Sequence, residues 1–543
     1  RPYLLASLVR HLDRPLLAIT SRIEEADHLV RDVQAFLGRG GAEVFPGWEV
    51  LPGEPLSPSV DTMGRRIDVL ARLQRGDKLV VVTTAQGATQ LVAPLSVSDV
   101  IELAEGGTVE LDPLSTTLVE LGYERNYMAE RRGEFAIRGG IVDVFPPAAE
   151  RPIRAELWGD EITSLREFAL ASQRSLDDID SVTITACREL RADTATRARA
   201  AELAKSSDDP DLAALAEGVL EPGAERLLPD IAGELVPLPA VFPPATPIVI
   251  IEAKRVRDRA DEVMEQVGEW LASTKDVDRY YADLDKVLAG AGSPILVSSF
   301  TEPQSHDLTI DTWTASAGKP DELAARLGDL ASQGYHAVVA ASLSETAERL
   351  RINFAQLGHR FEVTGSAPGD GEDPARTIVV AELSRGFVLP AARLALVAES
   401  DVTGRRSGAA RRRVSARRRR TEGPLDLAPG DLVVHDLHGI GRFAGMVERE
   451  LLGVHREYLV IDYAKDDKLY VPNDQVDLVS KYIGGEAPRI SRLGSAEWSK
   501  TKARVRRKTR EIAMELVKLY AERARAKGFA FGPDTPWQRE LED

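Results

Sequence analysis

Hydrophobic residues in segment 1–112 follow two spacings in turn. A helical spacing predicts helices over Tyr3–Leu12 and Glu24–Leu37, and unbroken apolar runs predict buried strands over Leu16–Thr20 and Lys78–Thr84. The apolar face of the second helix is formed by Leu29, Val33, Phe36 and Leu37. Strands that alternate with helices are typical of a doubly wound parallel sheet, which we predict for residues 1–112.

Residues 113–190 change to a strict alternation of apolar and polar side chains. The alternation covers Gly133–Phe145 and Ile153–Trp158. A period of two residues predicts strands with one buried face, here in a twisted antiparallel sheet. Residues 191–290 carry weaker signals, and only the Asp-rich stretch Ser206–Asp211 and the Pro-rich stretch Val236–Pro247 mark boundaries in them.

A second α/β pattern occupies residues 291–404. Two amphipathic segments, Asp321–Ser332 and Leu343–Gln356, predict helices. Apolar runs predict strands at Pro294–Ser298, His336–Ala341, Thr377–Val380 and Leu394–Glu399. Ser, His and Asp occur here without the spacing of a known catalytic arrangement, so we interpret the segment as a spacer domain.

Short strands separated by turns return in residues 425–485. Runs rich in Val, Leu and Tyr alternate with Gly, Asp and Asn, which predicts short antiparallel strands closing into a small β-barrel. Gly439 and Gly441 permit a sharp bend between the first two strands, and Pro472 ends the fourth because it lacks an amide donor. The strands are expected at Asp431–Asp436, Gly441–Glu450, Glu457–Ala464 and Lys468–Pro472.

Two basic clusters interrupt a chain that is acidic as a whole. The net charge of −17 argues against a uniform coat of nucleic acid. Arg405–Arg420 holds nine arginines and no acid, and it is either a solvated linker, which we favour, or a weak contact with DNA phosphates. The second cluster lies in a predicted helix, Trp498–Lys527, near whose amino terminus cations oppose the helix dipole. The basic side chains of this helix contact nucleic acid, contact an acidic partner protein, or face solvent. The candidate DNA-binding residues are Arg504, Arg506, Arg507 and Arg510.

Composition narrows the class of protein. Hydrophobic content of 43% with 29% charged residues is typical of globular domains. The single cysteine, Cys187, permits no intrachain disulfide, which fits a reducing cytoplasm. No apolar run reaches the roughly 18 residues of a membrane helix. The chain begins at Arg1 without Met and stops within a charged run at Asp543, so we expect it to be part of a longer protein.

The sequence offers neither a nucleotide site nor a metal site. A phosphate-binding loop, GxxxxGK followed by Ser or Thr, occurs nowhere between Arg1 and Asp543. His435 and His438 have no cysteine or clustered carboxylates beside them to complete a metal site. We therefore expect no cofactor, no metal and no catalytic residue within this chain.

The segment 425–485 resembles the RNA-polymerase-interacting domain that transcription-repair coupling factors share with CarD-type transcription regulators. The resemblance rests on Gly430-Asp431, Val433-Val434-His435, His438-Gly439-Ile440-Gly441, Glu457-Tyr458-Leu459 and Lys468-Leu469-Tyr470-Val471-Pro472. It implies a Tudor-like barrel whose strand edge meets the β subunit of RNA polymerase. Alignment on these motifs puts the key contact at Arg449, unless that residue is only a solvated edge charge. The other expected contact residues are Val447, Glu448, Glu450 and Leu451.

The segment 113–190 resembles domain 2 of UvrB, the damage-verifying subunit of bacterial nucleotide excision repair. The matching residues are Gly122-Tyr123, Arg125-Asn126, Arg132-Gly133-Glu134-Phe135, Ile137-Arg138-Gly139 and Gly159-Asp160-Glu161-Ile162. The resemblance implies docking onto UvrA, the damage sensor, through arginine-rich strands. Carried over to this chain, the UvrA-binding residues are Arg125, Arg132, Phe135 and Arg138. The alternatives are a solvated sheet face for the arginines and a core position for Phe135.

One segment of this chain departs from the UvrB pattern. In UvrB, an aromatic, Tyr-rich β-hairpin probes the DNA strand, and its aromatic rings are needed for stacking on bases. The corresponding segment, Phe45–Arg66, has Phe45 and Trp48, four prolines and no tyrosine. We therefore expect lesion verification to be absent. Asp160-Glu161, which resembles a helicase acidic box, falls in a predicted hairpin turn instead.

Together these resemblances identify the chain as the amino-terminal half of a member of the transcription-repair coupling factor family. They imply a multidomain α/β and α+β protein: a UvrB-like α/β module with an inserted antiparallel β domain, a second α/β domain, a small β-barrel and a long "relay" helix. Seven parts are expected. They are a UvrB-like domain 1a at 1–112, domain 2 at 113–190, domain 1b at 191–290, a spacer at 291–404, a basic linker at 405–424, the polymerase-interacting domain at 425–485, and the relay helix with the start of a motor at 494–543.

The resemblance also implies a function in transcription-coupled repair. The family binds stalled RNA polymerase, recruits UvrA, and moves on double-stranded DNA with an ATP- and Mg-dependent translocase of helicase superfamily 2, which we expect beyond Asp543. We expect a cytoplasmic monomer without membrane contact, whose UvrA-binding face is free of the carboxy-terminal domain that covers it in the family. The alternatives are a UvrB-type excision-repair helicase subunit and a non-motor, CarD-like transcription factor.

Overall fold

The computed structural model describes most of the chain up to Thr403 and parts of the remainder. The described residues are 1–54, 56–94, 100–170, 173–271, 277–299, 305–306, 308–313, 320–365, 376–403, 429–435, 438–451, 454–472, 479–482, 490 and 492. They fall into two compact units, Arg1–Gly408 and Ala409–Asp543. The expected basic linker, the expected helix Trp498–Lys527 and the four candidate DNA-binding arginines lie outside the described residues.

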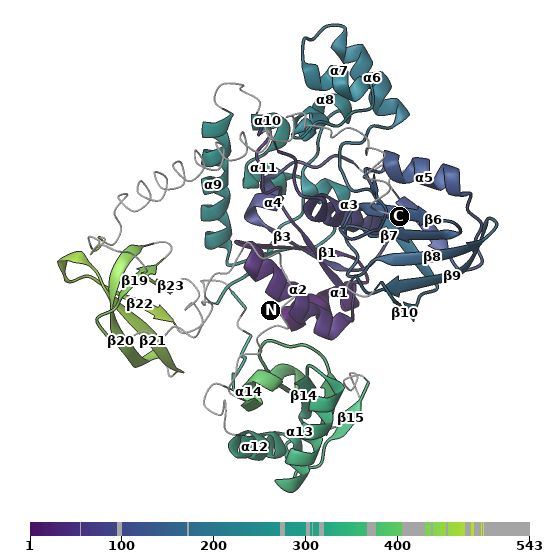
Figure 1. Cartoon of the computed structure of the whole chain (residues 1–543). Coiled ribbons are helices and arrows are strands. Elements are labelled where there is room, and N and C mark those ends of the chain that lie inside the picture. The colour runs from purple at the N-terminus through teal and green to yellow at the C-terminus, as the bar shows by residue number, and fades with distance from the viewer. Residues whose placement is uncertain are drawn as a thin grey trace, which may run out of the picture. The chain divides into compact units, whose positions relative to one another are not determined.

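The first unit begins with the parallel sheet that the sequence predicted (Figure 1). Its strand order is β13-β12-β1-β3-β2, and all four pairings are parallel. The central strand β1 has the predicted bounds, whereas β12 and β13 come from far along the chain. The strand expected at Pro294–Ser298 was assigned to the spacer segment, and this assignment was wrong, because the strand pairs with β12 in the first sheet. The strands are β1 (Leu16–Thr20), β2 (Ala42–Phe45), β3 (Val80–Thr84), β12 (Ile248–Ile251) and β13 (Ile295–Val297).

Helices cover both faces of this sheet, because its strands are apolar on both sides. Leu16 and Ala18 of β1 pack against the helices of one face, and Leu17 and Ile19 pack against those of the other. The first face carries α1 (Pro2–Leu12) and α2 (Ile23–Leu37). The second carries α3 (Val60–Gln74), α4 (Ala85–Thr89), α9 (Ala253–Trp270) and α11 (Leu284–Ala289).

An antiparallel sheet of six strands follows, as the alternating pattern predicted, in the order β10-β9-β8-β7-β6-β5. The edge pair β5–β6 is parallel, and the other pairs are antiparallel. One face packs on helix α5 (Leu111–Glu120) and on the two-stranded sheet of β4 (Val100–Ala104) and β11 (Ser181–Thr185). The strands are β5 (Glu124–Arg125), β6 (Glu134–Arg138), β7 (Ile141–Val144), β8 (Ile153–Trp158), β9 (Glu161–Phe168) and β10 (Ser175–Asp178).

A small helical layer lies along the chain between β11 of the antiparallel sheet and β12 of the parallel sheet. Its core is Leu190, Leu215 and Leu227, and Trp48 from the β2–α3 connection packs into it. Its elements, with the short helix that follows α9, are α6 (Thr194–Ala204), α7 (Pro210–Ala216), η2 (Ala224–Leu227), α8 (Leu228–Ile231), η3 (Leu238–Val241) and α10 (Val277–Tyr280).

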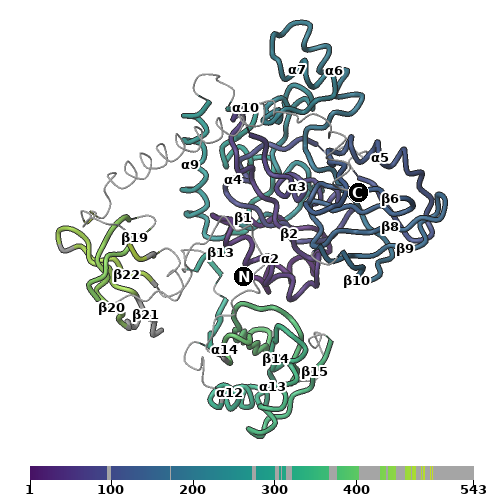
Figure 2. Tube along the Cα trace, in the orientation of Figure 1, coloured from purple at the N-terminus to yellow at the C-terminus, as the bar shows by residue number. Residues whose placement is uncertain are grey.

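The third sheet belongs to the segment interpreted as a spacer, which is the green part of the trace around β14 and β15 in Figure 2. Its strand order is β15-β16-β14-β18-β17. Its pairings are parallel except for the antiparallel edge pair β17–β18. One face packs on α12 and α13, and the other packs against Ala35 and Phe36 of α2. The elements are α12 (Pro320–Ser332), β14 (His336–Ala341), α13 (Ser344–Gln356), β15 (Glu362–Thr364), β16 (Arg376–Val380), β17 (Phe387–Leu389), η5 (Pro390–Ala392), β18 (Leu394–Ala398) and α14 (Glu399–Thr403).

The second unit holds a five-stranded antiparallel sheet in the order β22-β21-β20-β19-β23. The four predicted strands are present, a fifth follows them, and closure into a barrel stays a prediction. The elements are β19 (Leu432–His435), β20 (Gly439–Leu451), β21 (Val454–Asp462), η6 (Ala464–Asp466), β22 (Lys468–Pro472) and β23 (Val479–Lys481). Among the described helices of the chain, none is long and apolar enough to cross a membrane.

Candidate partner-binding surfaces

The six-stranded sheet turns a charged face away from its core. Phe135, Val142 and Ala155 point into the core, so the alternate residues of the same strands point to the opposite side. The cross-strand register lines up Asp143 on β7 with Arg154 on β8, and Arg154 with Arg166 on β9. A second row runs from Arg138 through Ile141 to Glu156.

Asp143 is the buried centre of this charged face. Its Oδ2 accepts hydrogen bonds from Arg138 Nη2 at 2.6 Å and Arg154 Nη2 at 2.9 Å, and its Oδ1 accepts from Arg154 Nε at 2.7 Å. The bond to Asp143 raises the pKa of Arg154. Because one carboxylate meets two guanidinium groups, the cluster keeps a net positive charge. Arg138, which is 36% exposed, presents that charge to solvent.

The other two arginines of the expected UvrA contact differ from each other. Arg125 lies on the edge strand β5 and is exposed. Arg132 is held by the fold, because its Nη1 donates to Asp61 Oδ1 at 2.8 Å and its Nη2 donates to the carbonyl oxygen of Ala149 at 3.1 Å. The exposed edge and Arg138 are therefore better suited than Arg132 to meet a partner.

The structure corrects the expected role of Phe135. Its side chain is 0% exposed and lies in the core between the sheet and α5. A partner cannot touch the ring in this conformation, so the alternative of a core position applies. The alternation of side chains along β6 indicates this core position. Phe135 and Ile137 point to the apolar side of the strand, whereas Glu134 and Arg138 point to the polar side.

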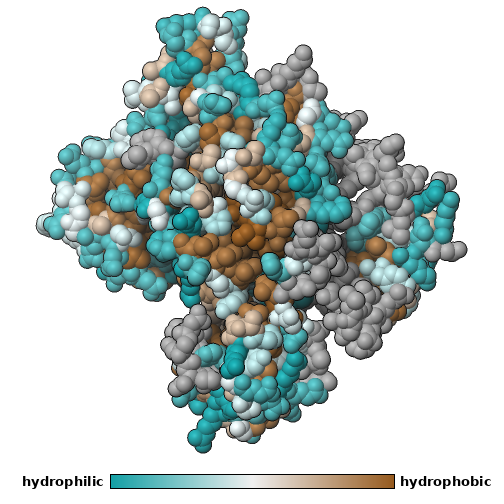
Figure 3. Space-filling model, turned by 180° about the vertical axis from the view of Figure 1, so that it is seen from behind, coloured by the Kyte–Doolittle hydropathy of each residue, from teal (hydrophilic) through white to brown (hydrophobic). Residues whose placement is uncertain are grey.

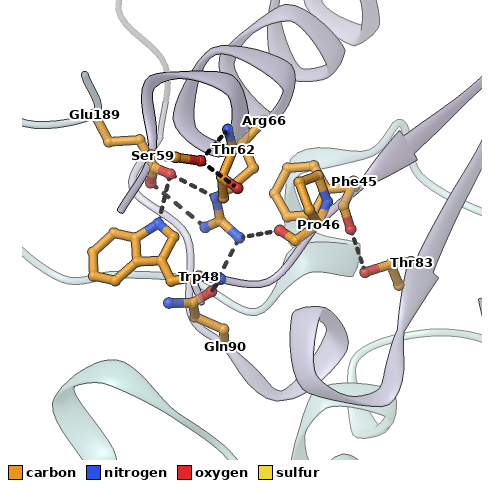
Figure 4. Close-up of polar contacts among 9 residues, drawn as sticks. All are labelled: Phe45, Pro46, Trp48, Ser59, Thr62, Arg66, Thr83, Gln90 and Glu189. Atoms are coloured by element: carbon orange, nitrogen blue, oxygen red, sulfur yellow. Dashed lines mark hydrogen bonds and ion pairs between the residues drawn. The ribbon is translucent and has the colours of Figure 1, made fainter. Parts of the chain in front are cut away.

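The segment Phe45–Arg66 is tied down by a buried arginine (Figure 4). Arg66 on α3 is 0% exposed, and its Nε donates to Glu189 Oε1 at 2.5 Å. Its Nη1 donates to the carbonyl oxygen of Pro46 at 3.0 Å and to Gln90 Oε1 at 3.1 Å. Trp48 Nε1 donates to the same oxygen of Glu189 at 2.9 Å. Glu189 thus joins the β2–α3 connection to the chain after β11.

Both aromatic rings of that segment are used by the core. Phe45 is 0% exposed and lies under the Arg66 guanidinium at 4.5 Å, and Trp48 is 3% exposed. Stacking on a base needs an open ring face. In this conformation neither ring can perform the task of the aromatic hairpin of UvrB.

The carboxyl end of β1, where α/β sheets commonly hold phosphates, is occupied by a carboxylate. Only Ser21 and Arg22 separate β1 from α2. Glu25, in the first turn of α2, accepts hydrogen bonds from Ser21 N at 3.2 Å and Ser21 Oγ at 2.8 Å, and from Arg255 Nη2 at 2.6 Å. In the spacer domain, Ser342 after β14 likewise donates its N–H and Oγ to Glu399. Each carboxylate therefore already accepts the hydrogen bonds that a phosphate bound at this position would need.

In the second unit, β20 has a free edge. Strand β19 pairs only with Gly439–Arg442 of β20, whereas β21 pairs with it as far as Leu451. Among the described residues, the stretch 445–451 is therefore paired on one side only, and its other backbone edge is open to a further strand. The expected contact residues Val447, Glu448, Arg449, Glu450 and Leu451 all lie on this stretch, where Arg449 stands opposite Arg456. The side chain of Arg449 lies outside what the structure describes.

The two histidines that could have suggested a metal pair lie together. The rings of His435 and His438 are 4.8 Å apart, and burial lowers the pKa of His438. Within the described residues, no group of three or more His, Cys, Asp or Glu side chains is arranged to hold a metal ion.

The hairpin turn expected at Asp160 is observed between β8 and β9.

Family models match the two segments that carry these candidate surfaces. Residues 101–190 match the family described as the UvrB interaction domain, and residues 427–483 match the CarD-like/TRCF RID domain. The transcription-repair-coupling factor of Mycobacterium bovis is 40% identical over 97% of this chain and 47% of its own length. The factors of Bacillus subtilis and Myxococcus xanthus are 29% and 30% identical over 99% and 98% of this chain, and in each case over 49% of the relative.

The chain thus spans about half the length of the curated relatives it matches, with 47% of one and 49% of two others covered. The matches to these relatives extend over nearly the whole chain, which carries both family-model matches. The chain therefore belongs to the transcription-repair-coupling factor family and corresponds to its amino-terminal region.

Proposed function

We propose that this chain is the recruiting half of a transcription-repair coupling factor. It binds stalled RNA polymerase through residues 425–485 and brings UvrA to the lesion through residues 113–190. The observation that carries the proposal is the presence, in one chain, of segments matched to a polymerase-interacting domain and to the UvrB interaction domain. A cytoplasmic monomer would suffice for this task, since the two surfaces lie on separate segments.

The seven domains expected from the sequence fit this role. Domains 1a, 2 and 1b form a UvrB-like module that also takes in β13, the remainder of residues 291–404 forms a spacer, and residues 405–424 form a linker to a Tudor-like barrel. The relay helix and the start of the motor, at 494–543, would connect to an ATP- and Mg-dependent translocase on double-stranded DNA. Arg504, Arg506, Arg507 and Arg510 are our proposed DNA contacts.

The UvrA-binding surface that we propose is centred on Arg125 and Arg138. Arg125 is exposed on an edge strand, and Arg138 carries the surplus charge of the Asp143 cluster. Arg125→Glu and Arg138→Glu are each expected to weaken UvrA binding by about 1.5–3 kcal/mol, because each loses charged hydrogen bonds across the interface. The measurement is a titration of UvrA against the chain without ATP or DNA.

Arg151→Glu is the matched control for this titration. Arg151 is also an exposed arginine of the six-stranded domain, and it pairs with Glu167 and Asp177. It lies just before the first residue of β8, at the end of the sheet opposite to Arg138. It is expected to leave UvrA binding unchanged. Equal binding by wild type, Arg125→Glu and Arg138→Glu would refute the proposed surface.

We also propose that the two α/β domains of this chain bind no nucleotide. Glu25 and Glu399 occupy the donors that follow β1 and β14, and a phosphate would meet a carboxylate there. Calorimetric titration with MgATP is therefore expected to give no binding heat, and the purified chain is expected to have no DNA-stimulated ATPase activity. Stoichiometric MgATP binding would favour the UvrB-type helicase alternative, which the buried Phe45 and Trp48 already disfavour.

A further inference from the structure

Two aromatic side chains stand out on the surface of the six-stranded domain. On the face drawn in Figure 3, hydrophobic residues gather near the middle of the view and lie among hydrophilic ones elsewhere. Single exposed hydrophobic residues are ordinary. Trp158 and Tyr127 differ from them in size and exposure, because they are 83% and 82% exposed. Tryptophan side chains are on average highly buried.

The backbone around Trp158 keeps its ring uncovered. Trp158 ends β8 and pairs only with Glu161 across the hairpin turn. The turn beside it, between β6 and β7, consists of Gly139 and Gly140, which have no side chains to cover the ring. Gly140 cannot be replaced freely, since a Cβ there would lie 2.6 Å from the carbonyl oxygen of Leu157. The local backbone therefore favours an open tryptophan at this position.

Tyr127, Arg138 and Trp158 lie at one end of the sheet. Strand β5 is parallel to β6, and β6 and β8 are both antiparallel to β7. The carboxyl ends of β5, β6 and β8 therefore point the same way. Tyr127 follows β5, Arg138 ends β6, and Trp158 ends β8. With about 4.8 Å between neighbouring strands, three spacings separate the outer two by about 14 Å, which lies well within one protein–protein interface.

We propose that Tyr127 and Trp158 are the aromatic anchors of the UvrA interface, one on each side of Arg138. The inference rests on the proposed function and adds the residues that supply its apolar contact area. Binding energy concentrates in buried Trp, Tyr and Arg side chains with a polar rim, and this end of the sheet offers all three. Asp160 and Glu161 lie beside Trp158, so the partner surface is acidic opposite Arg138 and apolar to basic opposite the β8–β9 turn.

The test compares UvrA binding by the whole chain and by four single variants. Trp158→Ala and Tyr127→Ala are each expected to weaken binding at least about tenfold, and Trp158→Phe is expected to retain most of it. Leu176→Ala is the matched control: Leu176 is 42% exposed on β10, whose first residue pairs with Phe168 at the opposite end of β9. It should bind as wild type does.

A second readout reports contact directly. Hydroxyl-radical oxidation of Trp158, read by mass spectrometry, is expected to fall when UvrA is added. The inference is overturned if Arg138→Glu weakens binding while both alanine variants bind as wild type and Trp158 stays open to oxidation; the proposed function then stands. It is also overturned if Leu176→Ala weakens binding equally. If the wild-type chain does not bind UvrA, the inference and the UvrA part of the proposed function both fail.

Discussion

An Arg66→Ala chain is expected to lose about 3–5 kcal/mol of unfolding free energy in its first α/β domain, because the variant leaves a buried carboxylate without its cation. Arg66 is 0% exposed, and the Glu189 side chain is 4% exposed. The same change removes the donors to Pro46 and Gln90 and the cation over the Phe45 ring. Since the chain has several domains, the measurement is urea unfolding followed by hydrogen exchange in residues 60–74 and 183–190.

Arg65→Ala is the control for this prediction. Arg65 is the next residue on α3, but it is 30% exposed and pairs with Asp61 at 3.3 Å on the helix surface, so its loss is expected to cost less than about 1 kcal/mol. The double variant Arg66→Met/Glu189→Leu removes both charges and is expected to recover much of the lost stability. If Arg66→Ala unfolds at the same urea concentration as Arg65→Ala, the buried pair does not stabilise the domain.

An Arg449→Glu chain is expected to lose about 2–5 kcal/mol of binding free energy for the polymerase β subunit. The residue lies on the stretch of β20 that is paired on one side only. A strand added to that edge brings its side chains next to position 449, and a reversed charge there would disrupt the contact. The measurement is a titration of β against both chains, with circular dichroism to verify the fold.

Arg442→Glu separates this effect from a general change of charge. Arg442 is exposed on the same strand, but it pairs with Leu432 of β19 on one side and Asp462 of β21 on the other. A further strand cannot reach it, so binding of β is expected to stay close to that of wild type. Equal losses for Arg442→Glu and Arg449→Glu, or no loss for either, would contradict the free-edge interpretation.

The sequence predicted best those elements whose pattern is strict and local. The strands Leu16–Thr20, Ile153–Trp158, His336–Ala341 and Lys468–Pro472 have the predicted bounds. Helix α3, by contrast, was not predicted, although Met63, Ile67 and Leu70 lie at helical spacing in it, and the burial of Arg66 on this helix was not predicted either. That position is buried only because Glu189 neutralises it, and a partner 123 residues away leaves no local signal.

The candidate sites show the same limit. The motifs located both segments that the family models match, and a core position for Phe135 was left open as the alternative to a partner contact. The sequence did not show which arginines the fold holds in place, since this depends on the ion pairs of Arg132 with Asp61 and of Arg138 with Asp143. The glycine turn likewise lies beside Trp158 in space rather than in sequence, since the Leu157 N–H donates to the carbonyl oxygen of Gly140.

A bridging assay tests most directly whether one chain joins RNA polymerase to UvrA. RNA polymerase is immobilised, and the chain and UvrA are added in sequence without ATP. UvrA is expected to be retained only when the chain is present. Arg138→Glu should leave the chain on the polymerase and release UvrA, and Arg449→Glu should release both. If wild-type chain stays on the polymerase and binds free UvrA, yet UvrA never joins it there, the recruiting role is contradicted.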